Sequence, residues 1–528
     1  MAGTLILKDA FKQYTDDQDK ILTPEETVAN FKSKLARIDL DILQGVKRID
    51  SGRLDIPVFF STCGRDALNV IGTRKQMGKG ATPAQAKASA VMELAERFSF
   101  FSFCKNADNF KVTTAKALGS QALPFEMVAR SVHDESGNLD AAQAVFETLP
   151  MRWTQGYNLS RQDSLWIPFD WFYTINEFNG PSAGNCVEEA LSQGICEVVE
   201  RHVCSLVSRN QIETPLIESR SSTDGKVREM LEKYARAGIN LFISDFSLDT
   251  GIPTVGVMAY DPATYPQKSE IVWTAGTTPS PEKSLSRALT EVAQLAGDFN
   301  TKANYLASGL PKLLSLNEAA YITDSGRQAP LDSLPDLSHA NIRVEVENLL
   351  EALNVRGYEV FTIDIGHPQL GVPAFYTLIP GTHFRERALN TSVGMFSAKL
   401  VAENQPPHQA LAKLGQIEAL IPGAYYVPFY QGTCRIALDD PQRALPYFEK
   451  ALELAPAEED LASIYSYMGV CLKDLARYDE ALDVLARGEA LDAGRTDIYN
   501  LQGFCYFKSG DHAKAVERFQ KVLDLDPG

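Results

Sequence analysis

The chain has 528 residues, of which 45% are hydrophobic, and 51 Lys and Arg against 68 Asp and Glu give it a formal net charge of −17 at pH 7. One hydrophobic core cannot organise a chain of this length, so two or three domains are expected, and the excess of acid disfavours binding to nucleic acid or to an anionic membrane surface. The eight cysteines show no C-x-x-C spacing, and the sequence has neither a bilayer-length apolar run nor a secretory leader pattern, so we expect a reduced, cytoplasmic protein without a zinc knot or a membrane span.

Residues 1–422 are predicted to form an α/β (α+β) core of tandem sheet-and-helix modules with a helical lead at the N-terminus. The evidence is a repeat: a helical pattern, a strand that starts after glycine and a second strand that starts with Gly-x-Pro occur twice, over 227–258 and 346–378. Strand starts with proline also occur at Pro57 and Pro168, where the missing N–H disturbs a sheet least. We expect amphipathic helices to cover the sheets.

Three of the predicted helices carry a glutamate followed three residues later by a glutamate or a glutamine. The pairs are Glu93 and Glu96, Glu197 and Glu200, and Glu291 and Gln294. At 100° per residue, Asn185, Glu189, Glu197 and Glu200 fall within about 120° of one another. An arginine stands beside two of these faces, since Arg201 follows Glu200 and Arg287 precedes Glu291 by one turn.

An amphipathic helix with a solvated acidic face is the simplest interpretation of any one of these segments. Recurrence in three modules, within apolar surroundings, favours carboxylates that gather around a cation. Oxygen ligands of this kind suit Mg²⁺, which often bridges substrate phosphates, and Arg201 and Arg287 could then hold phosphate oxygens. The stretch 72–80 lacks P-loop spacing and no G-x-G-x-x-G follows a strand, so the sequence predicts a nucleotide and Mg²⁺ site built from helices.

Residues 423–528 differ from the rest because they resemble tetratricopeptide repeats. Small residues and proline recur with a period close to 34 residues, as at Gly432, Gly469 and Gly503. We expect three helix pairs, over about 423–456, 460–493 and 495–528, and Pro527 would end the last one. Such arrays bury a core by stacking, so this region is predicted to be an all-α domain.

Taken together, the motifs resemble those of the YcaO family. The resemblance spans about 75–380. It rests on four motifs in order: Gly78-Lys79-Gly80 leading into Ser89, Glu93, Glu96 and Arg97; Ser182, Asn185 and Glu189 leading into Glu197, Glu200 and Arg201; Arg287, Glu291 and Gln294; and Asp364, Pro368, Gly371 and Pro373. Lys20 and Thr27 resemble a Lys/Ser pair of the family, with Thr in place of Ser.

The resemblance implies an enzyme that binds Mg-ATP, phosphorylates the oxygen of a peptide backbone amide and lets a nucleophile attack the carbon. It implies Mg²⁺ ligands at Glu93, Glu96, Glu197, Glu200 and Glu291. It implies ATP-binding residues at Lys20, Thr27, Ser182, Asn185, Glu189, Arg201 and Arg287. Glu200, Arg201 and Arg287 are the residues expected to carry catalysis.

The nucleophile stays open at this point. The chain shows neither the proline-rich tail usual in azoline-forming members nor a fused E1-like or flavin domain. We therefore expect thioamidation, or a sulfur-linked accessory role in ribosomal protein S12 methylthiolation, ahead of azoline-forming cyclodehydration. A rival of another class is a non-catalytic adaptor that binds nucleotide and presents a peptide on its repeats. Expected partners are a peptide or protein substrate, a partner or sulfur-delivery protein, and a second copy in a homodimer, with no nucleic acid and no membrane.

Overall fold

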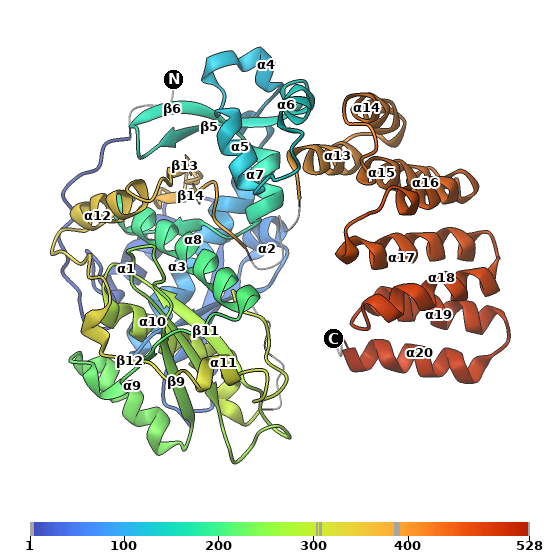
Figure 1. Cartoon of the computed structure of the whole chain (residues 1–528). Coiled ribbons are helices and arrows are strands. Elements are labelled where there is room, and N and C mark those ends of the chain that lie inside the picture. The colour runs from blue at the N-terminus through green and yellow to red at the C-terminus, as the bar shows by residue number, and fades with distance from the viewer. Residues whose placement is uncertain (1–4, 302–304, 306–308, 385–390, 526–528) are drawn as a thin grey trace. The chain divides into compact units, whose positions relative to one another are not determined.

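The computed structural model describes residues 5–301, 305, 309–384 and 391–525. The chain divides into two compact units (Figure 1). The core unit comprises 1–112, 120–123 and 152–388, and the helical unit comprises 113–119, 124–151 and 389–528. Within the described ranges, no helix combines the length and the apolar character that crossing a membrane requires.

The first module of the core unit is an antiparallel sheet covered by one long helix. Its elements are α1 (Pro24–Leu35), β1 (Leu43–Arg48), β2 (Val58–Cys63), α2 (Arg65–Ile71), β3 (Lys75–Lys79) and α3 (Pro83–Lys105), with strand order β1-β2-β3. Gly78 lets α3 lie directly on β3, because a Cβ there would stand 2.0 Å from the backbone nitrogen of Ala90. This contact fixes the part of α3 that carries Glu93 and Glu96.

The second module contains a sheet whose strands come from distant parts of the chain. Its strands run in the order β4-β5-β13-β14-β7, and β6 also pairs with β5. The elements are β4 (Lys111–Thr113), β5 (Met151–Asn158), β6 (Asp163–Pro168), α7 (Phe169–Asn176), β7 (Pro181–Ala183), α8 (Val187–Asn210), α12 (Ile342–Asn354), β13 (Phe361–Asp364) and β14 (Ala374–Leu378). The short strand β7 leads through a turn into α8, so the position of β7 sets that of the second acidic helix.

The third module is a five-stranded sheet with helices on both faces. Its strand order is β11-β10-β9-β8-β12. The elements are β8 (Leu216–Ile217), α9 (Gly225–Arg236), β9 (Asn240–Asp245), β10 (Thr254–Tyr260), β11 (Val272–Thr277), α10 (Pro281–Ala296), α11 (Ala320–Thr323) and β12 (Gln328–Ala329). Apolar side chains of α9 and α10 pack on one face of this sheet, and those of the C-terminal half of α8 and of α11 pack on the other.

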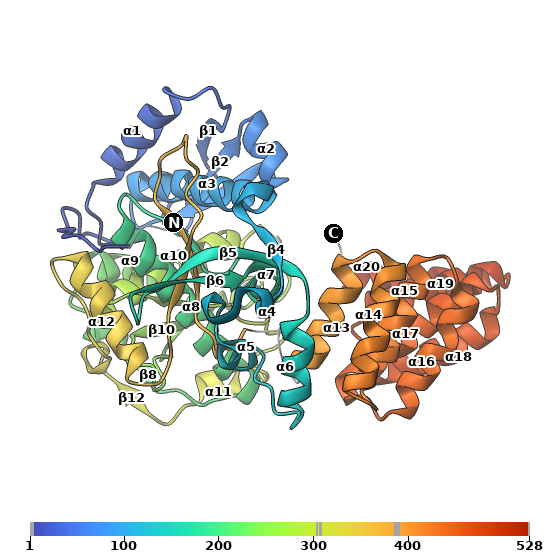
Figure 2. The same ribbon diagram turned by 90° about the horizontal axis from the view of Figure 1, so that it is seen from above.

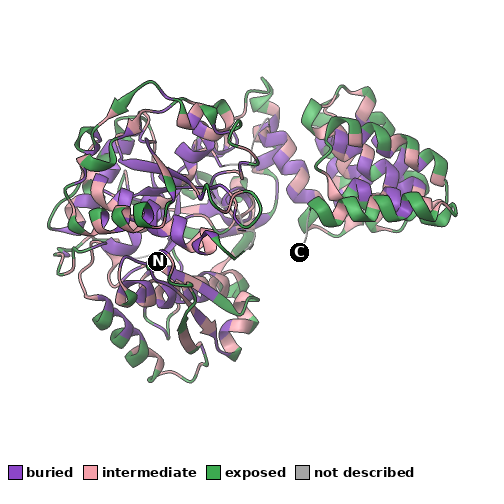
Figure 3. Ribbon diagram, turned by 90° about the horizontal axis from the view of Figure 1, so that it is seen from below, coloured by how far each residue is buried: buried purple, intermediate pink, exposed green. Residues whose placement is uncertain are grey.

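These modules confirm the predicted fold class of the core. The segments α9-β9-β10 and α12-β13-β14 each form a helix followed by two antiparallel strands, as the sequence repeat indicates. The three acidic helices α3, α8 and α10 (labelled in Figure 2) each follow a strand of their own module in the chain. Buried residues follow the strands and the inner sides of the helices (Figure 3), which is the pattern of sheets covered by amphipathic helices.

The helical unit confirms the tetratricopeptide repeats. Its elements are α4 (Ala115–Leu118), α5 (Phe125–Ser131), α6 (Leu139–Glu147), α13 (Val393–Asn404), α14 (Pro407–Leu420), α15 (Tyr426–Ala437), α16 (Pro441–Glu453), α17 (Glu458–Asp474), α18 (Tyr478–Leu491), α19 (Thr496–Lys508) and α20 (His512–Leu525). The last six form three antiparallel pairs. In the third pair, a Cβ at Gly503 would stand 2.7 Å from the Phe519 ring, so the small residue permits the close packing. Pro527 lies outside the described residues.

Candidate functional site

The acidic faces of α3, α8 and α10 line one cavity of about 300 Å³ in the core unit. The sequence-predicted residues on its wall are Lys20, Thr27, Glu93, Glu96, Asn185, Glu189, Glu197, Arg201, Arg287 and Glu291. They come from three modules and from the N-terminal segment, so the fold brings together residues spread over more than half of the chain. Ser182 and Glu200 lie behind this wall rather than on it.

On α3, the carboxylates of Glu93 and Glu96 both lie near one cation, Arg97. The Glu93 carboxylate accepts a hydrogen bond from Arg97 Nε at 3.0 Å, and a Glu96 carboxylate oxygen lies 3.7 Å from the same nitrogen. Burial, followed by the neighbouring Glu93, raises the pKa of Glu96 well above its usual range. The negative charge of Glu96 is therefore poorly compensated, and a cation in the cavity would relieve it.

On α8, Glu200 is buried, whereas Glu197 is only partly buried, and the two have different surroundings. Burial raises the pKa of Glu197, and the nearby Arg201 and Arg97 oppose this shift. Glu200 instead accepts hydrogen bonds from the backbone N–H of Thr277 at 3.1 Å and from Arg287 Nε at 3.4 Å. Glu197 thus faces the cavity, whereas Glu200 ties α8 to the end of β11 and to α10.

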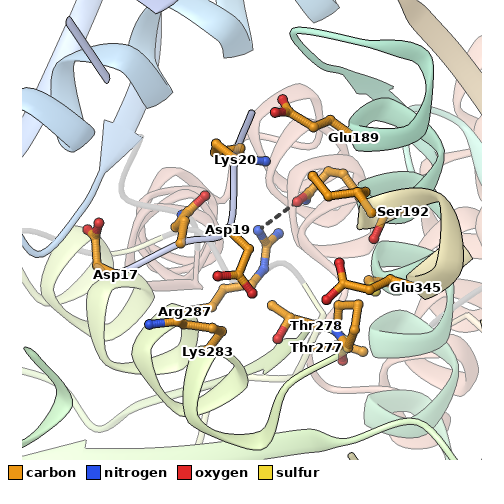
Figure 4. A pocket seen from close by; sticks show the side chains of 15 residues that line it. Asp17, Asp19, Lys20, Glu189, Ser192, Thr277, Thr278, Lys283, Arg287 and Glu345 are labelled. Atoms are coloured by element: carbon orange, nitrogen blue, oxygen red, sulfur yellow. Dashed lines mark hydrogen bonds between the residues drawn. The ribbon is translucent and has the colours of Figure 1, made fainter. Parts of the chain in front are cut away.

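Arg287 is held by partners on α8. Burial disfavours its charge, but Glu200 and Glu197 outweigh burial and raise the pKa of the guanidinium. Arg287 also contacts the side-chain amide oxygen of Gln193 (dashed line in Figure 4). A cation fixed in this way can meet phosphate oxygens without further ordering.

The end of β7, the turn after it and the start of α8 hold three of the residues predicted to bind ATP. Both the backbone N–H and the side-chain amide of Asn185 donate to Glu189, at 2.9 and 3.0 Å. The Ser182 hydroxyl donates to the Ala190 carbonyl at 2.7 Å and is fully buried. Asn185 and Glu189 therefore reach the cavity wall, while in this conformation Ser182 joins β7 to α8.

The N-terminal segment before α1 brings Lys20 to the cavity. The backbone N–H of Ile21 donates to Glu189 at 2.6 Å, and the Lys12 ammonium forms an ion pair with Glu345 of α12 at 2.5 Å. We call residues 5–22 the N-terminal strap. Thr27 follows on α1, buried at the cavity wall, so the predicted Lys20 and Thr27 pair does meet the acidic helices.

A smaller cavity of about 50 Å³ adjoins the first one (Figure 4). The two share wall residues, among them Lys20, Glu189, Gln193 and Arg287. The remaining wall carries both signs of charge, for example Lys283 and Glu345. A polar ligand in the larger cavity could therefore extend past Arg287 into a second polar space.

The chemistry of the wall fits Mg²⁺, although the carboxylates are not yet gathered around one point. Among the side chains that the structure describes, no three acidic, histidine or cysteine groups form a ready metal-binding set. Glu93 is turned toward Arg97, and Glu291 touches the ammonium of Lys79. A divalent cation would compete with these partners for hard oxygen donors of the kind that Mg²⁺ prefers.

Two wall residues received no role from the sequence. Burial and the neighbouring Arg287 lower the pKa of Lys79 to about 7, while Glu200, Glu93 and the touching Glu291 favour its charged form. The direct contact with Glu291 opposes loss of this proton, because a neighbouring carboxylate favours the charged form of an ammonium. Gln193 stands four residues from both Glu189 and Glu197, so helical spacing is a signal that could have identified it.

Comparison with known proteins now places the chain. A family model described as YcaO cyclodehydratase, ATP- and Mg²⁺-binding, matches residues 77–383, which is more than half of the chain. The chain belongs to the YcaO family. Tetratricopeptide repeat models match 431–458 and 496–528. Members of the family bind ATP and Mg²⁺, in agreement with the cofactors predicted from the sequence.

Individual relatives extend the match over most of the core. An uncharacterized protein of Methanothermobacter thermautotrophicus is 28% identical over 383 residues, which are 68% of this chain and 93% of that protein. The Escherichia coli protein named ribosomal protein S12 methylthiotransferase accessory factor YcaO is 25% identical over 392 residues, 68% of this chain and 64% of that protein. The structure of YcaO from Methanopyrus kandleri, bound with AMPPCP and Mg²⁺, shares the fold with a TM-score of 0.55 at 21% identity, over 71% of this chain and 95% of that chain.

Proposed function

We propose that this chain is an ATP- and Mg²⁺-dependent enzyme that activates a polypeptide backbone amide by phosphorylating its oxygen. The observation that carries the proposal is the convergence on one cavity of carboxylates from three modules with Lys20, Arg201 and Arg287. Phosphoryl transfer depends mainly on positioning and on compensation of charge. The acidic helices and the held arginines supply both.

Each group has a distinct role in this proposal. Arg201 and Arg287 hold phosphate oxygens, and Asn185 with Glu189 fixes the nucleotide at the start of α8. Mg²⁺, held by Glu93, Glu96, Glu197 and Glu291, would neutralise charge on the phosphates. Glu200 would reach a metal only by leaving Thr277 and Arg287, so we assign to it the positioning of Arg287.

Sulfur is the nucleophile that we favour. Support comes from the similarity to the E. coli S12 methylthiotransferase accessory factor. Attack of sulfide on the activated carbon would expel phosphate carrying the former amide oxygen, leaving a thioamide and ADP. The description of the family as cyclodehydratases supports a second candidate, in which a neighbouring Cys, Ser or Thr side chain attacks and an azoline forms.

The partners remain part of the proposal. The helix pairs α15 to α20 belong to a repeat type whose stacked surfaces commonly bind protein segments. We propose that they engage the substrate protein or a sulfur-delivery protein, and that the chain acts as a homodimer in a cytoplasmic setting. Light scattering of the full chain, alone and with candidate proteins, tests the oligomeric state.

Binding of Mg-ATP is the first test of the site. Titration calorimetry of the full chain should show Mg²⁺-dependent ATP binding that Glu93→Gln weakens at least tenfold. The matched control is Glu232→Gln, which removes an exposed carboxylate from α9 of the same unit and should bind as the wild type does. Equal binding by Glu93→Gln and the wild type would disprove the assignment of the acidic helices.

Mass spectrometry of peptides from cells with and without the protein tests the chemistry. Thioamidation predicts a mass gain equal to the exchange of one oxygen for sulfur, and cyclodehydration predicts the loss of one water. ATP binding without any modified peptide would favour the adaptor reading, in which the chain presents a polypeptide to another enzyme.

A further inference from the structure

A second large cavity of the core unit, about 590 Å³ in volume, shares no wall residue with the candidate ATP site. It lies over the sheet of the second module, where β5 and β6 meet β13 and β14 (strands labelled in Figure 1). Ligand pockets typically measure roughly 300–1,000 Å³. The cavity is therefore large enough for a bulky side chain together with some backbone.

The pleat of the sheet builds the floor of this cavity. Tyr157 is paired in register with both Ser164 and Thr362, so these three side chains share one face of the sheet. Two residues further along β13, Asp364 is paired with Phe375 on the same face. All five residues line the cavity.

Aromatic rings form the walls, and one of them is held in place from behind. Phe110, just before β4, and Trp166, on β6, both line the cavity. The guanidinium of Arg152 lies 4.7 Å from the centre of the Phe110 ring and is itself paired with Asp170 at 2.7 Å. The wall is thus ordered before any ligand arrives, which favours binding.

The polar groups of the cavity are few and specific. Thr362 is 1% exposed, and its hydroxyl has no hydrogen-bond partner among the described residues. A buried hydroxyl without a partner is unfavourable, so a ligand that offers an amide group would gain here. One cation, Lys111, stands against two acids, Asp108 and Asp364, which excludes a site built for a phosphorylated ligand.

The cavity lies close to the candidate ATP site along the sheet. Phe375 pairs in register with Ser182 of β7, three residues before Asn185. The backbone N–H of Gly184 donates to the Pro373 carbonyl at 3.1 Å, which ties the two neighbouring strands together beyond that pair. A ligand that occupies the cavity could extend across β14 and β7 toward α8.

We propose that this cavity binds a segment of the polypeptide substrate through an aromatic or large apolar side chain, while the amide to be activated lies at the ATP site. The inference rests on the proposed function, because it names the part of the chain that holds its substrate. It also gives a role to Asp364, which the sequence analysis singled out and the ATP site does not use.

A matched pair of variants on β6 tests the proposal. Ser164 points into the cavity and Asp163, its neighbour, points to the other face; both are exposed, and strands accept tryptophan readily. Fluorescence anisotropy of the full chain would use a labelled Gly/Ser peptide with one tryptophan, and the same peptide with alanine. We expect Ser164→Trp to weaken binding of the tryptophan peptide at least tenfold, Asp163→Trp to leave it unchanged, and the alanine peptide to bind at least tenfold more weakly.

A third variant distinguishes a loss of peptide binding from a loss of stability. Thr362→Val removes the unpartnered hydroxyl and keeps the side-chain shape, so we expect severalfold weaker peptide binding without a lower melting temperature. The proposal is overturned if neither peptide binds, if Ser164→Trp binds like the wild type, or if N-acetyl-tryptophanamide binds as tightly as the peptide, which would indicate a small-molecule site. Binding of Mg-ATP is measured on the same samples. If the wild type does not bind Mg-ATP, the proposed function is contradicted independently of the peptide results.

Discussion

Replacing Glu200 by Gln should destabilise the metal-free core unit. Glu200 is 4% exposed, and its carboxylate accepts from Thr277 N–H at 3.1 Å and from Arg287 Nε at 3.4 Å. Glutamine keeps the shape and can still accept from Thr277. It removes the negative charge, however, and leaves the buried Arg287 with less compensation.

The distances set the size of the effect. At an effective dielectric constant of about 20, unit charges 3.4 Å apart attract by roughly 5 kcal/mol before desolvation is subtracted. Removal of one partner from a buried ion pair typically costs about 3–5 kcal/mol, and the retained hydrogen bond places Glu200→Gln at the lower end. With about 2 °C per kcal/mol for a unit of this size, the melting temperature should fall by roughly 6 °C.

Glu96→Gln, on the same cavity wall, should not lower the melting temperature. Burial and Glu93 raise the pKa of Glu96 in the folded protein. The folded state therefore keeps this proton to a higher pH than the unfolded chain does, and its stability falls as pH rises above the usual carboxyl range. At pH 8 the neutral glutamine removes that penalty, so the melting temperature of Glu96→Gln should equal or exceed that of the wild type.

Scanning calorimetry at pH 8 with a metal chelator measures both variants. The transition of the core unit is the one that Mg-ATP raises in the wild type, since a ligand stabilises the unit that binds it. Both variants should lose that Mg-ATP shift. A fall of similar size for Glu96→Gln and Glu200→Gln, or no fall for Glu200→Gln, would refute the distinction between a cavity carboxylate and a positioning carboxylate.

Three further predictions follow from other parts of the structure. Burial raises the pKa values of Glu96 and Glu197, so Mg²⁺ should bind more weakly as pH falls and should release protons on binding; calorimetry in buffers of different ionisation enthalpy measures this, and equal heats would contradict it. Gly503→Ala places a Cβ 2.7 Å from the Phe519 ring, and overpacking should lower the stability of the helical unit by about 1–3 kcal/mol without changing Mg-ATP binding in the same titration. Asn341→Ala removes the side-chain oxygen that caps α12 by accepting from Arg343 N–H and that also accepts from Ala10 N–H of the strap. We expect a loss of stability of about 1–2 kcal/mol, faster proteolysis of the N-terminal strap and weaker ATP binding. An unchanged cleavage rate would show that the strap is held elsewhere.

The sequence was most informative where a pattern repeats. The E-x-x-[E/Q] segments in three modules predicted α3, α8 and α10, and the helix and two-strand repeat predicted α9-β9-β10 and α12-β13-β14. Such segments are recognisable because periodic burial dictates them locally. The helix pairs α15 to α20 were predictable for the same reason, since each repeat carries its own small residues at fixed spacing.

The parts that could not be predicted depend on contacts distant in sequence. The N-terminal strap has no periodic pattern, and its position follows from the pairing of Lys12 with Glu345, 333 residues away. Ser182 shares a motif with Asn185, yet its hydroxyl is taken by the Ala190 carbonyl. A motif gives the order of residues along the chain, whereas the direction of each side chain depends on which backbone group it meets after folding.

Glu197 and Glu200 show this limit most clearly. They stand three residues apart on one helix and close together on a helical wheel, so the sequence assigned both to the metal. A wheel gives an angle around the helix axis but no information on what the neighbouring strand presents at that angle. The end of β11 presents the Thr277 N–H to Glu200; Glu197 faces the cavity instead, and its burial outweighs the nearby Arg201 and Arg97. The same physical criterion underlies the proposed roles on the whole wall: a carboxylate with a backbone donor and a fixed arginine is assigned to the fold, and one with a raised pKa that faces the cavity is assigned to the cation.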